Sequence, residues 1–275
     1  MKRANSIART YRFCMIVVSA CALFFATALF ADDAPVKILT ADMGYMELPH
    51  LPPGGDKVNP IRMEALKSAA MSLGACGGLA WEANIINNSL NSEGTFLDQA
   101  FDFNWLLLDH DVLPPVLTQS NNTLNLADDQ TLRIDEKTYQ IVKPARFVTA
   151  PPNWRDYLWM QFDKPAMPSR SLLPQSRPEA EIWNHYIREG WVNGVEQAQA
   201  IFAANLNRLK RDMLGIVLYR ILLAEHMVSA PFVASADLGV TGDATQLRIN
   251  DQVMRITAQS ALQPDSKKWK PVITK

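Results

Sequence analysis

The segment LLLDHDV at positions 106–112 returns, with changes, as LLAEHMV at positions 222–228, an offset of 116 residues. The same offset aligns Gly78 with Gly194. In both places the segment closes an apolar run at helical spacing, and alternating β-branched residues, which are typical of strands, follow it. The echo indicates that one helix-then-strand pattern occurs twice in the chain.

A second echo lies further along each half. LRIDE at positions 132–136 resembles LRIND at positions 247–251 at an offset of 115, so one deleted residue joins the two registers. Together the echoes predict a helix-rich α+β fold with two pseudo-repeated helix–helix–β-hairpin units, at about 61–154 and 178–269. Chance similarity between two helix-then-hairpin segments is the alternative. Repeats of this size are typical of units whose apolar faces pack on each other or on neighbours.

Residue patterns also place the individual elements. Apolar residues at spacings of three and four predict helices at 61–91, 95–109, 154–160 and 179–226, the last with a break near Gly190 or Gly194. Alternation predicts strands at 116–126, 131–134, 138–142, 232–234, 246–249 and 253–257. Asp135-Glu136-Lys137 is a plausible hairpin turn between the second and third of these strands.

The N-terminus has the pattern of a secretory signal, which we assign to residues 1–31 and exclude from the fold. A basic region is followed by an apolar stretch from 13 to about 30, which two aspartates end. Residues 32–60 are rich in proline and predict an irregular arm, and residues 61–275 form the body. No later stretch is apolar over the roughly 20 residues that a spanning helix needs. We therefore expect a body that is soluble or attached only through its N-terminus.

Three ways of processing this signal fit the sequence. VSAC at positions 18–21 resembles a lipobox, in which Cys21 is lipidated and becomes the new N-terminus. Ordinary signal-peptidase cleavage after Ala31 or Ala28 is the second, and an uncleaved anchor is the third. Residues 22–30 stay apolar, whereas most lipoproteins turn polar soon after the cysteine.

Cys76 is the single cysteine of the body, so the body has no internal disulfide framework. It lies among small residues in GACGG at positions 74–78. We expect a small buried residue at a tight contact between helices, and a reactive thiol is the alternative.

No sequence pattern selects an enzyme or a cofactor. There is no nucleophile elbow and no phosphate loop, and the four histidines lack a metal-binding spacing. His110 and His226 are equivalent in the repeat and follow Asp109 and Glu225. A histidine near a helix end is favoured by the helix dipole and can cap the last carbonyls. A shared acid/base or metal site is the alternative, but we predict no catalytic residue, no metal and no cofactor.

Charged and aromatic clusters indicate protein partners. The formal net charge is -1, so we expect no direct contact with nucleic acid. The basic cluster RLKRD at 208–212 predicts a solvated helix surface, with a contact to an acidic partner as the alternative. In NWRDYLWMQF at 153–162, Trp154, Tyr157 and Trp159 are candidate interface residues, because Trp, Tyr and Arg are enriched at interface hot spots. Core packing is the alternative for this segment.

Several long segments, in order, resemble the DotC family, whose plasmid branch is called TraI in I-type conjugation systems. The resemblance spans about 62–272 and is carried by five segments: GGLAW at 77–81, LLDHDVLPPV at 107–116, ARFVTAPPNWR at 145–155, EGWVNGVEQA at 189–198 and LGVTG at 238–242.

This resemblance implies a periplasm-facing structural subunit of the outer-membrane core complex of a type IVB secretion or conjugation system. Members are typically lipoproteins that work in a multi-copy ring with DotD-like and DotH-like partners and help to place the DotH-like subunit at the outer membrane. The family carries no catalytic motif, and the cargo, DNA or effector protein, is not specified by the sequence. A periplasmic hydrolase that remodels the cell wall, with His110 or His226 in its site, is the rival interpretation.

Overall fold

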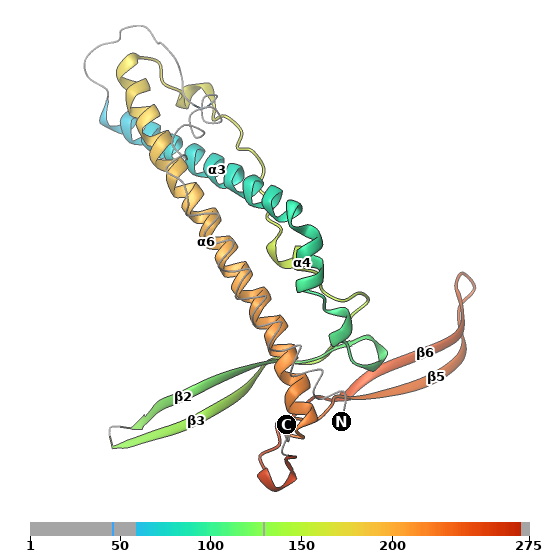
Figure 1. Ribbon diagram of the computed structural model, residues 1–275. Coiled ribbons are helices and arrows are strands. Elements are labelled where there is room, and N and C mark those ends of the chain that lie inside the picture. The colour runs from blue at the N-terminus through green and yellow to red at the C-terminus, as the bar shows by residue number, and fades with distance from the viewer. Residues whose placement is uncertain (1–45, 47–58, 129, 271–275) are drawn as a thin grey trace. The chain divides into compact units, whose positions relative to one another are not determined.

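The computed structural model describes Met46, residues 59–128 and residues 130–270, except for the side chains of 125–128 and 131–133 (Figure 1). The predicted signal at 1–31 lies outside the described residues, as does the predicted arm at 32–60 apart from Met46, Asn59 and Pro60. Long helices alternate with two-stranded antiparallel sheets. The predicted α+β class is therefore confirmed, whereas the boundaries of signal, arm and body stay predictions.

Two long helices dominate the chain. α3 (Pro60–Ser92) begins with proline in its first turn, and the Asn59 side chain accepts a hydrogen bond from the Ile61 amide, a typical N-cap. α6 (Arg177–Ala224) runs for 48 residues without interruption, so the predicted break near Gly190 or Gly194 is wrong. The short helix α4 (Gly94–Ala100) ends nine residues before the predicted end at 109. Single turns follow it at Asn104–Leu106 and Asp109–Asp111.

Each strand pair is a hairpin. β2 (Val116–Asp128) pairs with β3 (Thr131–Lys143), and β5 (Phe232–Gly242) pairs with β6 (Leu247–Ala258). The predicted turn at 135–137 is wrong, because β3 runs straight through it, with Asp135 paired to Thr123. The polar residues that resemble a turn lie on an exposed ribbon, where polar side chains carry no burial cost. The two strands instead stay paired as far as Asp128 and Thr131.

The two hairpins share one register. Leu117 pairs with Ile141 in the first hairpin, and Val233 pairs with Ile256 in the second. The first members of these pairs differ by 116 residues and the second members by 115, which are the two offsets of the sequence echoes. The pairing therefore repeats with the single deleted residue that the sequence indicates.

The closure at the base of each hairpin repeats as well. β1 (Val112–Leu113) pairs with β4 (Arg146–Phe147), and in the other half Val228 forms a bridge with Leu262. Beside the first closure the Val148 amide donates to the Asp111 carbonyl at 3.0 Å. Beside the second the Gln263 amide donates to the Met227 carbonyl at 2.8 Å, again at the offsets 115 and 116.

The described residues form two compact units, and each unit contains residues from both halves of the sequence. The helical unit holds Met46, 59–99 and 154–208. The hairpin unit holds 100–153 and 209–270, including both hairpins and the end of α6.

Inside the helical unit, α3 and α6 cross (Figure 1). Both helices carry glycines where their backbones meet. A Cβ atom added to Gly74 would collide with the carbonyl oxygen of Ile187, and one added to Gly78 would collide with that of Trp191. Because both contacts advance by four residues, the helices run in parallel at the crossing. The close approach of the two backbones explains why glycine stands here within a helix.

At the same crossing, the glycines of α6 lie against the backbone of α3. A Cβ at Gly190 would collide with the Met71 carbonyl, and one at Gly194 with the Ala75 carbonyl. These contacts are the equivalents of the first two at the offset of 116, so the two helices pack with internal pseudo-two-fold symmetry. A core of seven buried residues lies here: Met46, Leu66, Ala70, Leu73, Trp183, Ile187 and Trp191.

Candidate interaction surfaces

The outer part of each hairpin exposes an apolar cross-strand pair. Leu124 and Ile134 are paired on β2 and β3 and are 66% and 69% exposed. Val240 and Ile249 hold the equivalent positions on β5 and β6 and are 64% and 69% exposed. A chain that places the same apolar pair twice in solvent has two equivalent surfaces suited to protein contact.

The base of the first hairpin is packed on α6 within the hairpin unit. Leu117 of β2 is 1% exposed and clusters with Tyr219 and Leu222. Gly215 lets the strand approach, since an added Cβ would collide with the Leu117 backbone. The hairpin is thus held firmly at one end while its apolar pair remains accessible near the other.

Polar contacts fasten the same base. The Lys143 ammonium lies 2.5 Å from the carboxylate of Asp212, which is 2% exposed and also bound by Arg211. The Gln259 side chain donates to the carbonyl of Ala145 and accepts from its amide, both at 3.1 Å. Pairing and hydrogen bonding compensate the burial of these polar groups.

The predicted aromatic segment contributes both to the core and to the surface. Trp154 begins α5 (Trp154–Leu158) and is 1% exposed, and its indole N–H donates to Asp98 at 2.7 Å. This hydrogen bond, with a smaller contribution from Arg155, lowers the pKa of the Asp98 carboxyl. Trp154 thus packs within the chain, as the alternative of core packing expected.

The other two aromatic candidates are more accessible. Tyr157 is half-buried, and the guanidinium of Arg208 lies over its ring at 5.4 Å from the centroid. Trp159 is 43% exposed. The structure therefore offers Trp159, with part of Tyr157, as the contact surface of this segment, and the interface itself stays a prediction.

His110 and His226 share an unusual backbone conformation. Their φ angles are 63° and 61°, in the left-handed region that side-chain-bearing residues seldom adopt. At the end of α6 the His226 amide donates to Leu223 and the Met227 amide donates to Leu222, which is a Schellman motif with His226 in the place usually taken by glycine. His226 thus ends the helix through its backbone, whereas His110 lies in a single turn rather than at the end of a long helix.

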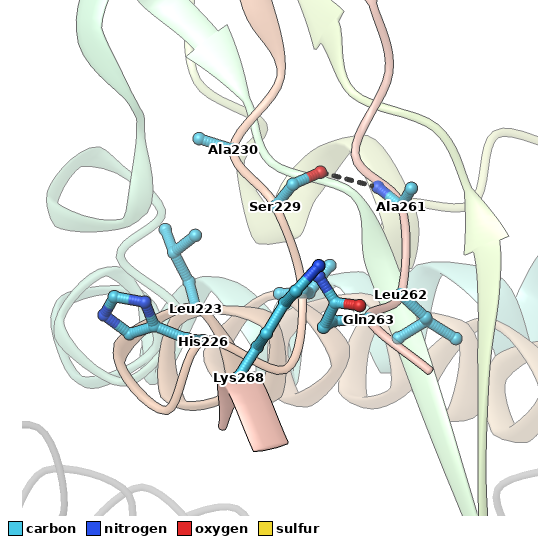
Figure 2. A pocket seen from close by; sticks show the side chains of 9 residues that line it. Leu223, His226, Ser229, Ala230, Ala261, Leu262, Gln263 and Lys268 are labelled. Carbon is cyan, nitrogen blue, oxygen red and sulfur yellow. Dashed lines mark hydrogen bonds between the residues drawn. The ribbon is translucent and has the colours of Figure 1, made fainter. Parts of the chain in front are cut away.

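An open cleft of about 470 Å³ lies beside His226 in the hairpin unit (Figure 2). Its lining mixes polar and apolar side chains, with His226, Gln263 and Lys268 among them. The Ser229 hydroxyl accepts a hydrogen bond from the Ala261 amide at 3.0 Å across the closure. His110 is not one of the residues that line this cleft, so the cleft does not unite the two histidines.

The buried carboxylates of the helical unit have partners within that unit. Glu179 receives two hydrogen bonds from Arg62, at 2.6 and 3.0 Å, and these lower the pKa of its carboxyl. Burial raises the pKa of Glu82, against the opposing hydrogen bond from Gln199 at 3.0 Å. Among the described residues no group of three or more His, Cys, Asp and Glu side chains could hold a metal ion.

Two of the cysteines, Cys21 and Cys76, carry predictions. Cys21, the candidate for lipidation, lies outside the described residues. Cys76 is exposed, so the prediction of a buried residue is wrong. The tight contact is made by its neighbours Gly74 and Gly78, and Cys76 lies on a different side of the helix. None of the helices in the described part is long and apolar enough to span a membrane.

The tight helix contact expected around positions 74–78 is present, but its partner glycines on the second helix are a feature that the sequence prediction lacks. Gly74 and Gly78 are four residues apart, and Gly190 and Gly194 repeat this spacing at the offset of 116. Glycines four residues apart on two helices predict close backbone packing. The break expected near Gly190 or Gly194 is instead the second half of this contact.

A comparison with protein families gave a match over most of the chain. Residues 60–271 match the family described as type IV secretory system, conjugal DNA-protein transfer. The chain belongs to this family. The match covers both hairpins and both long helices, so this type IV secretion component is a member over its whole described body. A comparison with curated proteins gave no match.

Proposed function

We propose that this type IV secretion component is a DotC-like structural subunit of an outer-membrane core complex. It binds DotD-like and DotH-like subunits, helps to place the DotH-like subunit at the outer membrane, and performs no chemistry on a substrate. The observation that supports this role best is the repeated apolar pair, Leu124 with Ile134 and Val240 with Ile249, on hairpins that leave it exposed. Family membership supports the place in conjugal transfer.

Attachment to the outer membrane is part of the same proposal, and Cys21 is its lipidation site. The test is membrane fractionation of a conjugating host that carries the full chain, its Cys21→Ser variant or neither. We expect the DotH-like subunit to leave the outer-membrane fraction when the chain is absent. If that subunit stays in place without the chain, the proposed function fails. If Cys21→Ser leaves the chain in the membrane fraction, attachment depends on protein partners instead.

The rival hydrolase is separated by a second pair of variants. His110→Ala and His226→Ala together remove both histidines that the repeat makes equivalent. DNA transfer at the wild-type frequency, with the protein folded, is the expected result and removes the enzyme interpretation. Loss of transfer while the DotH-like subunit still reaches the outer membrane would favour the enzyme.

A further inference from the structure

Each hairpin has an outer edge without a strand partner among the described residues. β2–β3 and β5–β6 are separate two-stranded sheets, so β3 and β6 each pair on one side only. An isolated two-stranded ribbon is marginally stable, and an unpaired edge is a template for a strand of another chain. Both ribbons thus have the backbone geometry for edge-to-edge pairing.

The side chains at these two edges are complementary. β3 carries Ile134 and Asp135 in succession, and β6 carries Arg248 and Ile249. If β3 and β6 meet in antiparallel orientation with the isoleucines opposite each other, Asp135 lies opposite Arg248. Opposite charges directly across two strands stabilise the pairing, and like charges destabilise it. The order of these residues therefore fits this antiparallel orientation in this register.

The apolar residues reinforce the same register. Ile134 already faces Leu124 within its hairpin, and Ile249 faces Val240. Pairing the two edges would align all four side chains in one row, on the face opposite to the Asp135–Arg248 pair. All four apolar side chains are more than 60% exposed in the single chain, so this contact would bury part of each one.

We propose that the β3 edge of one copy pairs with the β6 edge of a second copy of this chain. The inference rests on the proposed function for the presence of several copies in one assembly. A second copy is the occupant because the charged and apolar complements of each edge are found on the other edge of the same sequence. The contact joins two different surfaces, so successive copies repeat it and can close into a ring. Two ribbon edges bury less than a stable free dimer needs, so the contact forms inside the assembly.

The test uses disulfide trapping in the full chain, in cells that carry out transfer. Asp135→Cys and Arg248→Cys are combined in a Cys76→Ser background. Residues directly opposite in an antiparallel pair have Cα atoms within disulfide reach. We expect a ladder of disulfide-linked dimers and larger multimers under oxidation. Each single variant should remain a monomer.

A matched control shifts one cysteine along the strand. Thr138→Cys replaces Asp135→Cys and stays on the exposed edge, but lies three residues, or about 10 Å, from the proposed position. It should give no ladder with Arg248→Cys. A ladder of equal yield from this control would show nonspecific collision and overturn the proposal. So would dimers from Asp135→Cys alone, which would mean that two β3 edges meet.

Exchanging the charges of Asp135 and Arg248 provides a second test of the same contact. Ile134→Cys with Ile249→Cys reports the pairing while Asp135 and Arg248 are altered. Asp135→Arg or Arg248→Asp alone should lower the yield of linked species by about two- to fivefold, the range expected for a cross-strand charge pair. Both changes together should restore the yield.

The two proposals fail in different ways. If the double-cysteine chain reaches the outer membrane and supports transfer but gives no ladder, the hairpins meet another protein and only this inference is overturned. If the wild-type chain leaves the DotH-like subunit unaffected, the proposed function fails whatever the crosslinks show.

Discussion

The helix crossing at the glycines and the exposed apolar pairs of the hairpins are both duplicated, and they differ in where the equivalent residues find their contacts. Gly74 and Gly190 are equivalent, and each faces a carbonyl of the other helix within the helical unit. Ile134 and Ile249 are equivalent too, yet each is 69% exposed. The helix contacts of the repeat are completed inside one chain, whereas its hairpin surfaces remain uncovered in the described part. That contrast separates residues kept for folding from residues available to partners.

The largest expected effect is a substitution at the crossing. Gly190→Leu places a side chain where even a Cβ would collide with the Met71 carbonyl, so the helices must separate along their length. Because backbone atoms cannot move aside as a flexible side chain can, we expect a loss of more than about 3 kcal/mol in the free energy of unfolding. Urea unfolding followed by circular dichroism measures it.

The control for this substitution lies on the same helix. Ala203 is exposed on α6, and Ala203→Leu should change the free energy of unfolding by less than about 0.5 kcal/mol. If Gly190→Leu is as mild as Ala203→Leu, the close crossing does not hold the helical unit together.

An intermediate effect on stability is expected when two amide side chains, one in each unit, are removed. Asn87 of α3 donates to the Met160 carbonyl at 2.6 Å and accepts from its amide at 3.2 Å, with both groups buried. Gln259 makes the same double contact with Ala145, but only partly buried. Unsatisfied backbone groups cost more when water cannot replace the partner. We therefore expect about 2–4 kcal/mol lost for Asn87→Ala and about 1 kcal/mol for Gln259→Ala.

Unfolding curves of both variants test this difference under the same conditions. Equal losses would mean that water reaches both sites alike and that the helical unit is no tighter than the base of the hairpins. A larger loss for Gln259→Ala would reverse the comparison.

The parts of this molecule that were predictable from sequence are those with a periodic signal. The echoes at 106–112 and 222–228 predict where each half passes from helix to hairpin, because a repeated chain must repeat its pairing register. The turn at 135–137 was misplaced since Asp, Glu and Lys are equally compatible with a turn and with an exposed strand. Local composition cannot distinguish these two environments.

The surface residues were harder to predict for a related reason. Trp154 and Trp159 lie five residues apart in one aromatic segment, yet one is 1% and the other 43% exposed. Trp154 packs against a part of the chain that is distant in sequence, and its indole donates a hydrogen bond to Asp98, a residue 56 positions away. Burial that depends on such a distant partner has no local sequence signal, whereas glycines at a fixed spacing on both helices do.

The smallest expected effect on stability lies at the exposed apolar pair of the second hairpin. Val240→Thr together with Ile249→Thr keeps β-branched side chains, which suit strands, and removes apolar surface that water already reaches. The free energy of unfolding should change by less than about 0.5 kcal/mol. Leu117→Thr, at the buried base of the other hairpin, should cost about 2 kcal/mol or more, because it places a hydroxyl in an apolar cluster. Urea unfolding curves of the two variants measure both losses in the free energy of unfolding. A loss at Val240 and Ile249 as large as the loss at Leu117 would show that this apolar pair is buried within the single chain, and the contrast between crossing and hairpins would disappear.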